Sequence, residues 1–419
     1  MLEHYFLKIE TIDNIRGSWL GEPIERYVTW LAKHGYSSRT VYRRVPILKQ
    51  FGEFAQCRGA LSWDDLPAHI EPFVAHWVKL HAKNPKQAVQ WVANEAQTPV
   101  NQLLSLILSN HPGSRARRSV STPFINQAPK FFQYLSKERG LKNSSLFHYG
   151  HYLRSFEAYL KRINLFKLEE LSPTILSAFI IDNNQFSKTT MTGLCSTLRV
   201  FLRYLHSEQL HLRDLSSTIE SPRQYKLADV PRSISWGDVQ SMFDAVDRRT
   251  KLGKRDHAIL LLLITYGLRG YEVAALTLDH IDWQQERLMI PERKAGHSTA
   301  YPLSSVVGEA ILEYLKEGRP NTEDRHVFFR TMAPRKAITS GCISSRVKHY
   351  LLKAGITVPR PGSHTLRHSC VQRLVDANFS FKTIGDYVGH ASPSSTAIYS
   401  KVDLEALREV AMGHGEKLL

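Results

Sequence analysis

Apolar residues recur at helical spacing through the first half of the chain. Residues 27–34 carry this pattern up to a stop at Gly35, and residues 38–54 form a second, more basic stretch of the same kind. A similar arrangement returns 105 residues later, over residues 132–139 and 144–159. The pattern predicts a helical first half that contains a duplicated helical unit. Chance similarity between two amphipathic helix pairs is the alternative.

Matched apolar positions support the repeat. The matched pairs are Leu48 with Leu153, Phe51 with Phe156, Phe54 with Tyr159, and the segment 63–66 with the segment 168–171. Between the two units, residues 110–122 contain Pro, Gly, several Ser and three Arg without an apolar period, which is typical of a linker. A second linker is predicted over residues 216–233, because Pro222 and Pro231 exclude a continuous helix there. We therefore expect three domains, at 1–115, 116–220 and 221–419.

The pattern becomes mixed after residue 234. Ser235 followed by Asp238 predicts a capped helix start. Residues 287–293 and 298–303 read as two short strands joined by a tight turn. Further helices are predicted at residues 254–266, 306–316, 343–354, 365–377 and 382–388, and residues 396–411 are predicted to form a last helix pair or one bent helix. The expected fold class is mainly α with a small antiparallel sheet (α+β).

The excess of basic over acidic residues indicates what kind of molecule the protein binds. Lys and Arg number 55 against 39 Asp and Glu, which gives a formal net charge of +16. Such a chain usually meets a polyanion, either nucleic acid or an anionic membrane. No apolar run is long enough to span a membrane, and the N-terminus lacks the pattern of a secretory signal. Four cysteines without metal-site spacing fit a reducing cytoplasm, so we expect a cytoplasmic protein.

Four short segments contain candidate chemistry. They are Gly267–Glu272 with Arg269, the turn at Lys294, the box His364–His368 with Arg367, and Gly389–His390 followed by Tyr399. Each alone is weak evidence. His364 and His368 have the four-residue spacing of a metal-binding pair, but no Glu follows His364 and no third ligand presents itself, so a zinc site is not expected.

Together, these residue types suit phosphodiester transfer without a metal. Two arginines can clamp the non-bridging oxygens of a phosphate in flight with permanently charged, bidentate forks. A tyrosine can attack phosphorus and conserve the bond as a phosphotyrosine ester. A positioned Lys or His can protonate the leaving 5′-oxygen.

The segments resemble the tyrosine recombinases, or phage-type integrases, most clearly over residues 235–412. That family has an arginine in a Gly-Leu-Arg-x-x-Glu segment, a lysine on a hairpin, a His-x-Leu-Arg-His box, a Gly-His pair and a nucleophilic tyrosine. All five occur here in family order, and Tyr399 follows His390 by nine positions. The resemblance implies the catalytic set Arg269, Lys294, His364, Arg367, His390 and Tyr399. The lysine match is the softest, because Arg293 and His297 flank the same turn.

The same resemblance implies a helical, SAM-like core-binding domain over residues 116–220. Residues 1–115 depart from the common two-domain members of the family, and we expect them to form an extra helical domain that binds DNA or contacts another protein. It implies double-stranded DNA as substrate, a homo-oligomer on DNA such as a tetrameric synapse, and no cofactor or metal. Partner recombinases and accessory DNA-bending proteins are further candidate partners. We expect the enzyme to serve a mobile element, and integration, transposition, dimer resolution and inversion stay open as its use in the cell.

Basic residues in the first two domains are candidate DNA contacts: Arg39, Arg43, Arg44, Lys49 and Arg154. A solvated helix face is the alternative for the first four. Three other functions stay open from the sequence: a type IB topoisomerase, a non-catalytic DNA-binding relative, and, for the front half alone, an RNA-binding or adaptor module.

Overall fold

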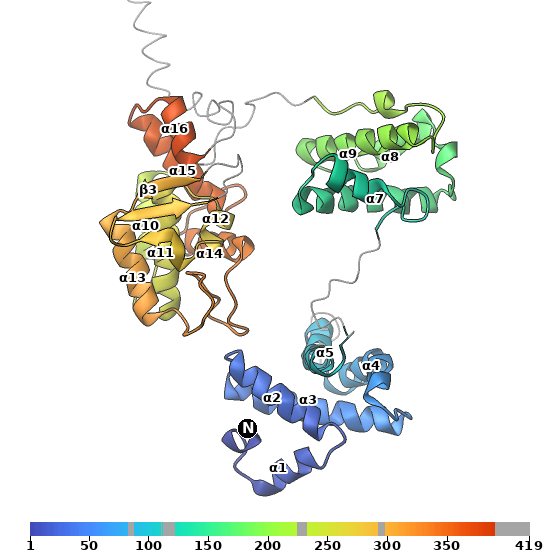
Figure 1. Cartoon of the computed structure of the whole chain (residues 1–419), viewed down its shortest axis with the longest axis vertical. Helices are drawn as coiled ribbons and strands as arrows, with labels where there is room; N and C mark the ends of the chain where they lie inside the picture. The colour runs from blue at the N-terminus through green and yellow to red at the C-terminus, as the bar shows by residue number, and fades with distance from the viewer. Residues whose placement is uncertain (83–87, 110, 112–121, 224–232, 292–297, 390–419) are drawn as a thin grey trace, which may run out of the picture. The chain divides into compact units, whose positions relative to one another are not determined.

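The protein is mostly helical, with one small antiparallel sheet. The computed structural model describes residues 1–82, 88–109, 111, 122–223, 233–291 and 298–389 (Figure 1). Contacts divide the chain into two compact units, Arg115–Ala228 and the combination of Met1–Ser114 with Asp229–Leu419. The buried apolar residues form separate cores within residues 2–104, 124–219 and 234–366. The expected fold class is confirmed.

The first core is built from helices. They are α1 (Ile9–Arg16), α2 (Gly21–Lys33), α3 (Ser38–Cys57), α4 (Ile70–His81) and α5 (Ala88–Ile107), with a 3-10 helix at Trp63–His69. Helix α5 packs against α2, α3 and α4. Fully buried aromatic side chains such as Tyr27 and Phe51 fill the space between these helices.

The second core has its own helices. They are α6 (Phe131–Gln133), a π-helical turn (Tyr134–Glu138), α7 (Asn143–Arg162), a 3-10 helix (Leu168–Glu170), α8 (Pro173–Asp182) and α9 (Lys188–Ser207). Helix α7 packs against α9 in this core. Ser172 and Ser187 cap the starts of α8 and α9 by accepting hydrogen bonds from backbone N–H groups.

The predicted repeat is visible in the order of the elements. Each of the first two cores contains a glycine with positive φ, Gly35 at +73° and Gly140 at +61°. A helix of 20 residues begins three residues after each of these glycines. A short 3-10 helix, a shorter α-helix and another helix of 20 residues come next in both halves. Four matched residues are completely buried: Leu48, Leu153, Phe51 and Phe156. The two residues of each matched pair therefore pack in the first and second hydrophobic cores respectively.

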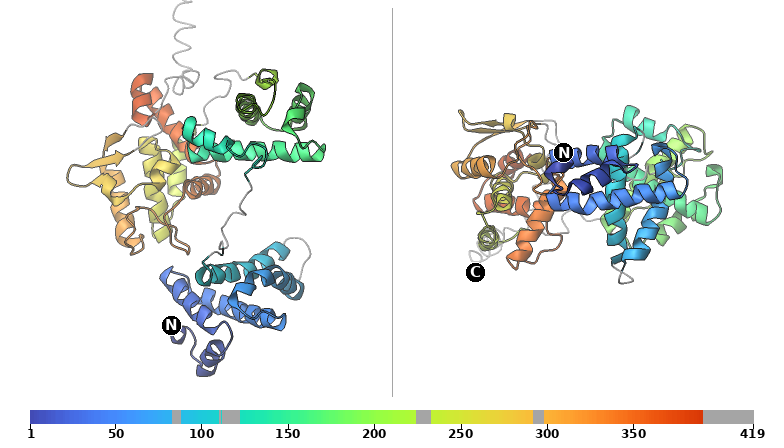
Figure 2. Two further views of the ribbon diagram at one scale, coloured as in Figure 1. Left: turned by 45° about the vertical axis from the view of Figure 1, so that its right-hand side comes forward. Right: turned by 90° about the horizontal axis from the view of Figure 1, so that it is seen from below.

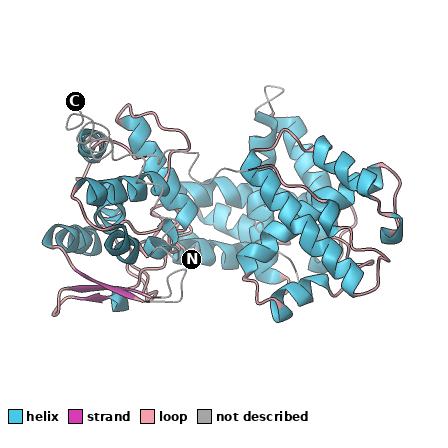
Figure 3. Cartoon of the chain, turned by 90° about the horizontal axis from the view of Figure 1, so that it is seen from above, coloured by secondary structure: helices cyan, strands magenta, loops and turns pink. Residues whose placement is uncertain are grey.

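Residues 233–389 combine helices with the sheet. The helices are α10 (Trp236–Asp244), α11 (Lys251–Tyr266), α12 (Gly270–Ala274), α13 (Ser305–Glu317), α14 (Ser340–Lys353), α15 (Ser363–Asp376) and α16 (Phe381–Val388), and the strands are β1 (Ile281–Asp282), β2 (Arg287–Ile290) and β3 (Thr299–Pro302). The strands pair in the order β1-β2-β3, both pairs antiparallel. The sheet lies along one edge of the helices (Figures 2 and 3). Helix α11 packs against α13 and α15 in the centre.

Several predicted elements of this part are confirmed, with shifted ends. The capping box of Ser235 and Asp238 starts α10. The two predicted strands pair as expected, but both are shorter, and the two-residue strand β1 was not anticipated. The turn around Lys294, residues 396–411 and most of the first predicted linker lie outside the described residues, as does half of the second linker. The predicted start of the second linker is wrong, because Ser216–Thr218 form a 3-10 helix and Ile219 is buried in the second core.

No helix in the described part of the chain is both long and apolar enough to cross a membrane.

Candidate active site

The end of α11 brings the first candidate arginine into place. Gly267 ends the helix in the left-handed conformation, at φ +58°, which glycine adopts without steric cost. A Cβ atom at this position would lie 2.9 Å from Cγ1 of Val388 and 3.2 Å from Sγ of Cys370. The chain therefore turns here in close contact with α15 and α16, and Arg269 follows as the N-cap of α12.

Arg269 is fixed by a buried carboxylate and a helix end. Its backbone N–H donates to Oε2 of Glu272 at 2.8 Å, and its Nη1 donates to Oε1 of the same residue at 3.0 Å. The side chain of Glu272 is only 1% exposed, and a buried carboxylate is costly without a positively charged partner. The ion pair with Arg269 therefore stabilises the negative charge of Glu272. Nη2 of Arg269 donates to the carbonyl of Gly389 at 2.8 Å. Arg269 thus joins α12 to the end of α16.

Arg367 reaches the same helix end from α15. It is 4% exposed, its Nη1 donates to the carbonyl of Gly267 at 2.5 Å, and its Nη2 donates to the carbonyl of Val388 at 2.8 Å. The structure therefore brings together two arginines that are 98 positions apart in sequence, as the sequence motifs require. Both guanidinium groups are oriented by backbone carbonyls.

His364 lies one turn before Arg367 on α15. Desolvation by the surrounding protein and the positive charges of Arg367 and Arg269 lower the pKa of His364, although its side chain is exposed in the free chain. A lowered pKa keeps the imidazole neutral near pH 7, the form that can accept a proton. The rings of His364 and His368 have centroids 6.4 Å apart. Within the described ranges, no three His, Cys, Asp or Glu residues form a group that could hold a metal ion.

Three of the six candidate catalytic residues, Lys294, His390 and Tyr399, lie outside the described residues. The described chain reaches Gly389, directly before His390, and both strands that flank Lys294. The assignments of these three residues remain predictions.

The candidate DNA contacts on α3 are mostly engaged within their own domain. Arg43 forms an ion pair with Glu95 at 3.3 Å. Nη1 of Arg44 donates to the hydroxyl of Tyr27 at 2.9 Å and to Oε1 of Gln102 at 2.8 Å.

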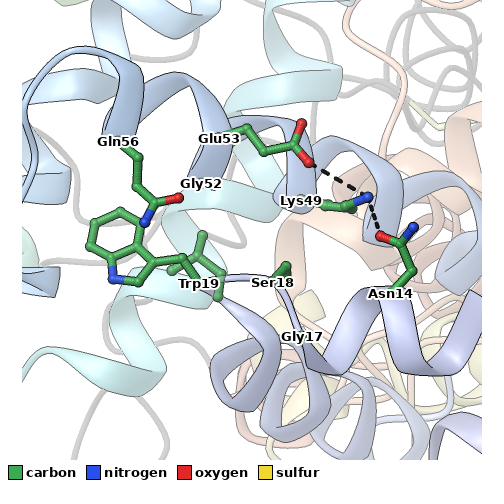
Figure 4. Close-up of a pocket in the computed structure, with 9 residues that line it drawn as sticks. Asn14, Gly17, Ser18, Trp19, Lys49, Gly52, Glu53 and Gln56 are labelled. Atoms are coloured by element: carbon green, nitrogen blue, oxygen red, sulfur yellow. Dashed lines mark hydrogen bonds and ion pairs between the residues drawn. The ribbon is translucent and has the colours of Figure 1, made fainter.

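Lys49 borders a hollow that Asn14, Trp19, Glu53 and Gln56 also line (Figure 4). Its ammonium group donates to Oδ1 of Asn14 and lies 3.5 Å from Oε1 of Glu53. Arg39, by contrast, is exposed on the first turn of α3. These internal partners compete with phosphate for Arg43, Arg44 and Lys49, and the role of the three residues in DNA binding remains a prediction.

Arg154 lies half-buried on α7 of the second core. An ideal Cβ at Gly150, one turn earlier, would stand 3.1 Å from its Nη1. The guanidinium group therefore folds back over the helix at the position where glycine leaves room for it. Its role as a DNA contact also remains a prediction.

Most of the groups that orient the two arginines could not be predicted from the sequence. The accepting groups are the backbone carbonyls of Gly267, Val388 and Gly389, which have no sequence signature. A tyrosine cluster beside them, described below, was also missed, because its members are spread over 122 positions. Only Glu272 could be anticipated, as part of the Gly-Leu-Arg-x-x-Glu segment.

Comparison with known proteins defines the class. Residues 233–405 match the phage integrase family, and residues 128–216 match its N-terminal SAM-like domain. The chain is 32% identical over 390 residues to a putative integrase/recombinase, y4rA, of Sinorhizobium fredii, covering 92% of each chain. It is 26% identical to the tyrosine recombinase XerD of Vibrio vulnificus, covering 71% of this chain and 97% of the relative.

The fold agrees with these relatives. The structure of a lambda integrase tetramer bound to a Holliday junction matches with a TM-score of 0.53 and 16% identity, covering 76% of this chain and 87% of that one. The chain belongs to the phage integrase family and is a tyrosine-type site-specific recombinase. This membership decides against the topoisomerase and adaptor alternatives.

Proposed function

We propose that this recombinase cleaves and rejoins DNA through a 3′-phosphotyrosine at Tyr399. The observation that supports the proposal most strongly is the meeting of Arg269 and Arg367 at one helix end, beside His364. Two guanidinium groups held in a partly dry site can stabilise the charge that develops on a phosphate in transfer. Tyr399, nine residues after His390, supplies the nucleophile.

The remaining residues complete a balanced reaction. Tyr399 attacks the scissile phosphorus while Arg269 and Arg367 hold the non-bridging oxygens and His390 donates to a phosphate oxygen. His364 assists by accepting the phenol proton of Tyr399, and it returns this proton when the tyrosine is released. Lys294 gives a proton to the departing 5′-oxygen, which leaves as a hydroxyl. A 5′-hydroxyl of a partner duplex then attacks the phosphotyrosine and restores the tyrosine. The ester conserves the bond, so the cycle needs no external energy source.

We further propose double-stranded DNA as the partner and a homo-oligomer, such as a tetramer, as the active assembly. The lambda integrase relative is a tetramer on a Holliday junction, which supports this assembly by analogy. The net charge of +16 supports a polyanionic partner. Service to a mobile element, and a requirement for accessory proteins, belong to the same proposal.

Capture of the covalent protein–DNA adduct tests the proposed function and identifies the DNA sequence that the protein cleaves. The chain is incubated with a pool of random duplexes, each carrying a nick that lets the cleaved end diffuse away, and denaturing gels recover the protein–DNA adducts. Sequencing of the captured DNA is expected to give one consensus, and peptide mapping is expected to place the adduct at Tyr399. A chain that relaxes plasmids without sequence preference and yields no consensus would contradict the proposal.

We predict that Lys294→Ala is rescued by chemistry at the leaving group. The variant should cleave an ordinary captured site slowly, but recover most of its rate when sulfur replaces the bridging 5′-oxygen. A thiolate leaves without protonation, so a general acid becomes dispensable. Single-turnover rates on the two substrates check this. Equal defects on both would show that Lys294 only positions DNA, and Arg293→Ala and His297→Ala should then be compared.

We also propose the domain division 1–115, 116–220 and 221–419, in which the first domain adds affinity or partner contacts but no chemistry. The separate cores and the repeated element order support this proposal. We predict that a truncated chain starting at Ser119 still forms the Tyr399 adduct on a half-site, while affinity or full recombination falls. Adduct yield and a binding titration measure the two effects. A truncated chain that is folded but unable to cleave would contradict a separable accessory domain.

A further inference from the structure

The C-terminal end of α16 is held by side chains from three other segments. The carbonyls of its last residues, Tyr387, Val388 and Gly389, accept hydrogen bonds from Tyr301, Arg367 and Arg269 respectively. The last carbonyls of a helix have no partner within the helix, and they carry partial negative charge. Here two cationic groups and one hydroxyl satisfy three consecutive carbonyls. This helix end is therefore an anchor that both arginines of the site share, in addition to Glu272 for Arg269 and the carbonyl of Gly267 for Arg367.

Tyr301 links this helix end to the sheet. It lies on β3, opposite Leu288 of β2, and is only 3% exposed. Its ring packs edge-on against Tyr387, with centroids 5.2 Å apart, and at a tilt against Tyr266, with centroids 5.0 Å apart. Its hydroxyl donates to the carbonyl of Tyr387. The bond joins a rigid strand to the last turn of α16.

The same cluster links α16 and β3 to α11. The hydroxyl of Tyr387 donates to the carbonyl of Thr265 at 2.9 Å. The hydroxyl of Tyr266 donates to the carbonyl of Pro302 at 3.0 Å and accepts from the backbone N–H of Ser304 at 2.9 Å. Tyr266 directly precedes Gly267, whose carbonyl orients Arg367. The three tyrosines therefore connect the sheet to both backbone segments that hold the arginines.

We propose that Tyr301 is a positioning residue for strand cleavage, acting through the end of α16 on Arg367 and Arg269. This inference rests on the proposed role of the two arginines in holding the scissile phosphate. Without the hydroxyl of Tyr301, the last turn of α16 loses its tie to β3, and the carbonyls that orient both guanidinium groups can shift. Rates of phosphoryl transfer respond steeply to such shifts, because a misplacement of about 1 Å can cost on the order of 100-fold.

The test is Tyr301→Phe, which keeps the ring and its packing and removes only the hydroxyl. Single-turnover adduct formation is measured on a captured half-site at saturating protein, together with affinity and thermal unfolding. We expect the rate to fall about 10-fold, a fraction of the loss that a 1 Å misplacement can cause, with nearly unchanged affinity. Tyr387→Phe removes the bond to Thr265 and should slow the same step, so it serves as the second variant if Tyr301→Phe does not fold.

Tyr314→Phe is the matched control. Tyr314 is a buried tyrosine of the same core, and its hydroxyl accepts from the backbone N–H of Phe329 at 3.1 Å, away from α16. It is expected to lose some thermal stability and to cleave at the wild-type rate. Its comparison with Tyr301→Phe separates lost stability from lost positioning.

A charge-neutral substrate identifies the route of the effect. When a methylphosphonate replaces the scissile phosphate, less charge has to be met by the arginines, so the gap between wild type and Tyr301→Phe should narrow. An equal gap on both substrates, or a wild-type rate for Tyr301→Phe and Tyr387→Phe on ordinary DNA, would overturn the positioning role. Failure of the wild-type chain to form any adduct would instead reject the proposed function itself.

Discussion

Replacing Tyr399 by Phe is expected to abolish the covalent adduct while leaving DNA binding nearly normal. Phenylalanine keeps the ring and loses only the oxygen that attacks phosphorus, so no ester can form. The adduct should fall below detection on denaturing gels, whereas a mobility-shift titration on the same half-site should give nearly the wild-type affinity. Among the substitutions considered, this one has the largest expected effect on chemistry.

Other tyrosines of the domain are the appropriate comparison. The hydroxyl of Tyr350 donates to the buried Asp256 at 3.0 Å, that of Tyr387 donates to Thr265, and burial raises the pKa of both phenols. Both are therefore poor nucleophiles. Tyr271 is exposed, and its hydroxyl lies 3.4 Å from Oε1 of Glu272, so Tyr271→Phe is the sharper control. An adduct that persists in Tyr399→Phe but disappears in Tyr271→Phe would assign the nucleophile to residue 271.

Local signals in the sequence predicted those elements whose causes are local. The capping box at Ser235, the left-handed stop at Gly267 and the pair of strands around the turn are each determined by a few neighbouring residues. The repeat in the first half was also predictable, because it depends on apolar spacing. The strand β1 was not, since a strand of two residues exists only through its pairing with β2.

In the candidate site, too, local features could be predicted from the sequence and long-range contacts could not. The residue types in the motifs indicated Arg269 and Arg367, because only certain side chains can perform the chemistry. The groups that orient them are backbone carbonyls, and any residue type can supply a carbonyl. These carbonyls can orient the arginines only because Gly267 packs against α16 in the folded chain. The hydrogen bonds join positions about 100 residues apart. Such contacts have no period and no motif, so they become visible only in the folded chain.

The two arginines should not tolerate lysine. In Arg367→Lys and Arg269→Lys, we expect adduct formation to slow on the order of 100-fold or more, the usual cost of removing one donor to a developing oxyanion. Arg367 uses two separate nitrogens to bond the carbonyls of Gly267 and Val388, and the single ammonium of lysine cannot span both. Arg269 similarly bridges Glu272 and Gly389. Single-turnover rates at saturating protein measure the loss of transition-state stabilisation apart from binding.

Arg373→Lys provides the matched control on the same helix. Arg373 lies over the ring of Trp236, with its guanidinium carbon 4.3 Å from the ring centroid. The carbonyls of Val388 and Gly389 at the end of α16 instead accept from Arg367 and Arg269. A lysine ammonium can also lie over the face of a tryptophan ring, although it does not stack as a guanidinium group does. This variant is expected to cleave at close to the wild-type rate and to unfold at a similar temperature. If Arg367→Lys or Arg269→Lys cleaves as fast as Arg373→Lys, that arginine does not hold the scissile phosphate, and positive charge alone would be sufficient at its position.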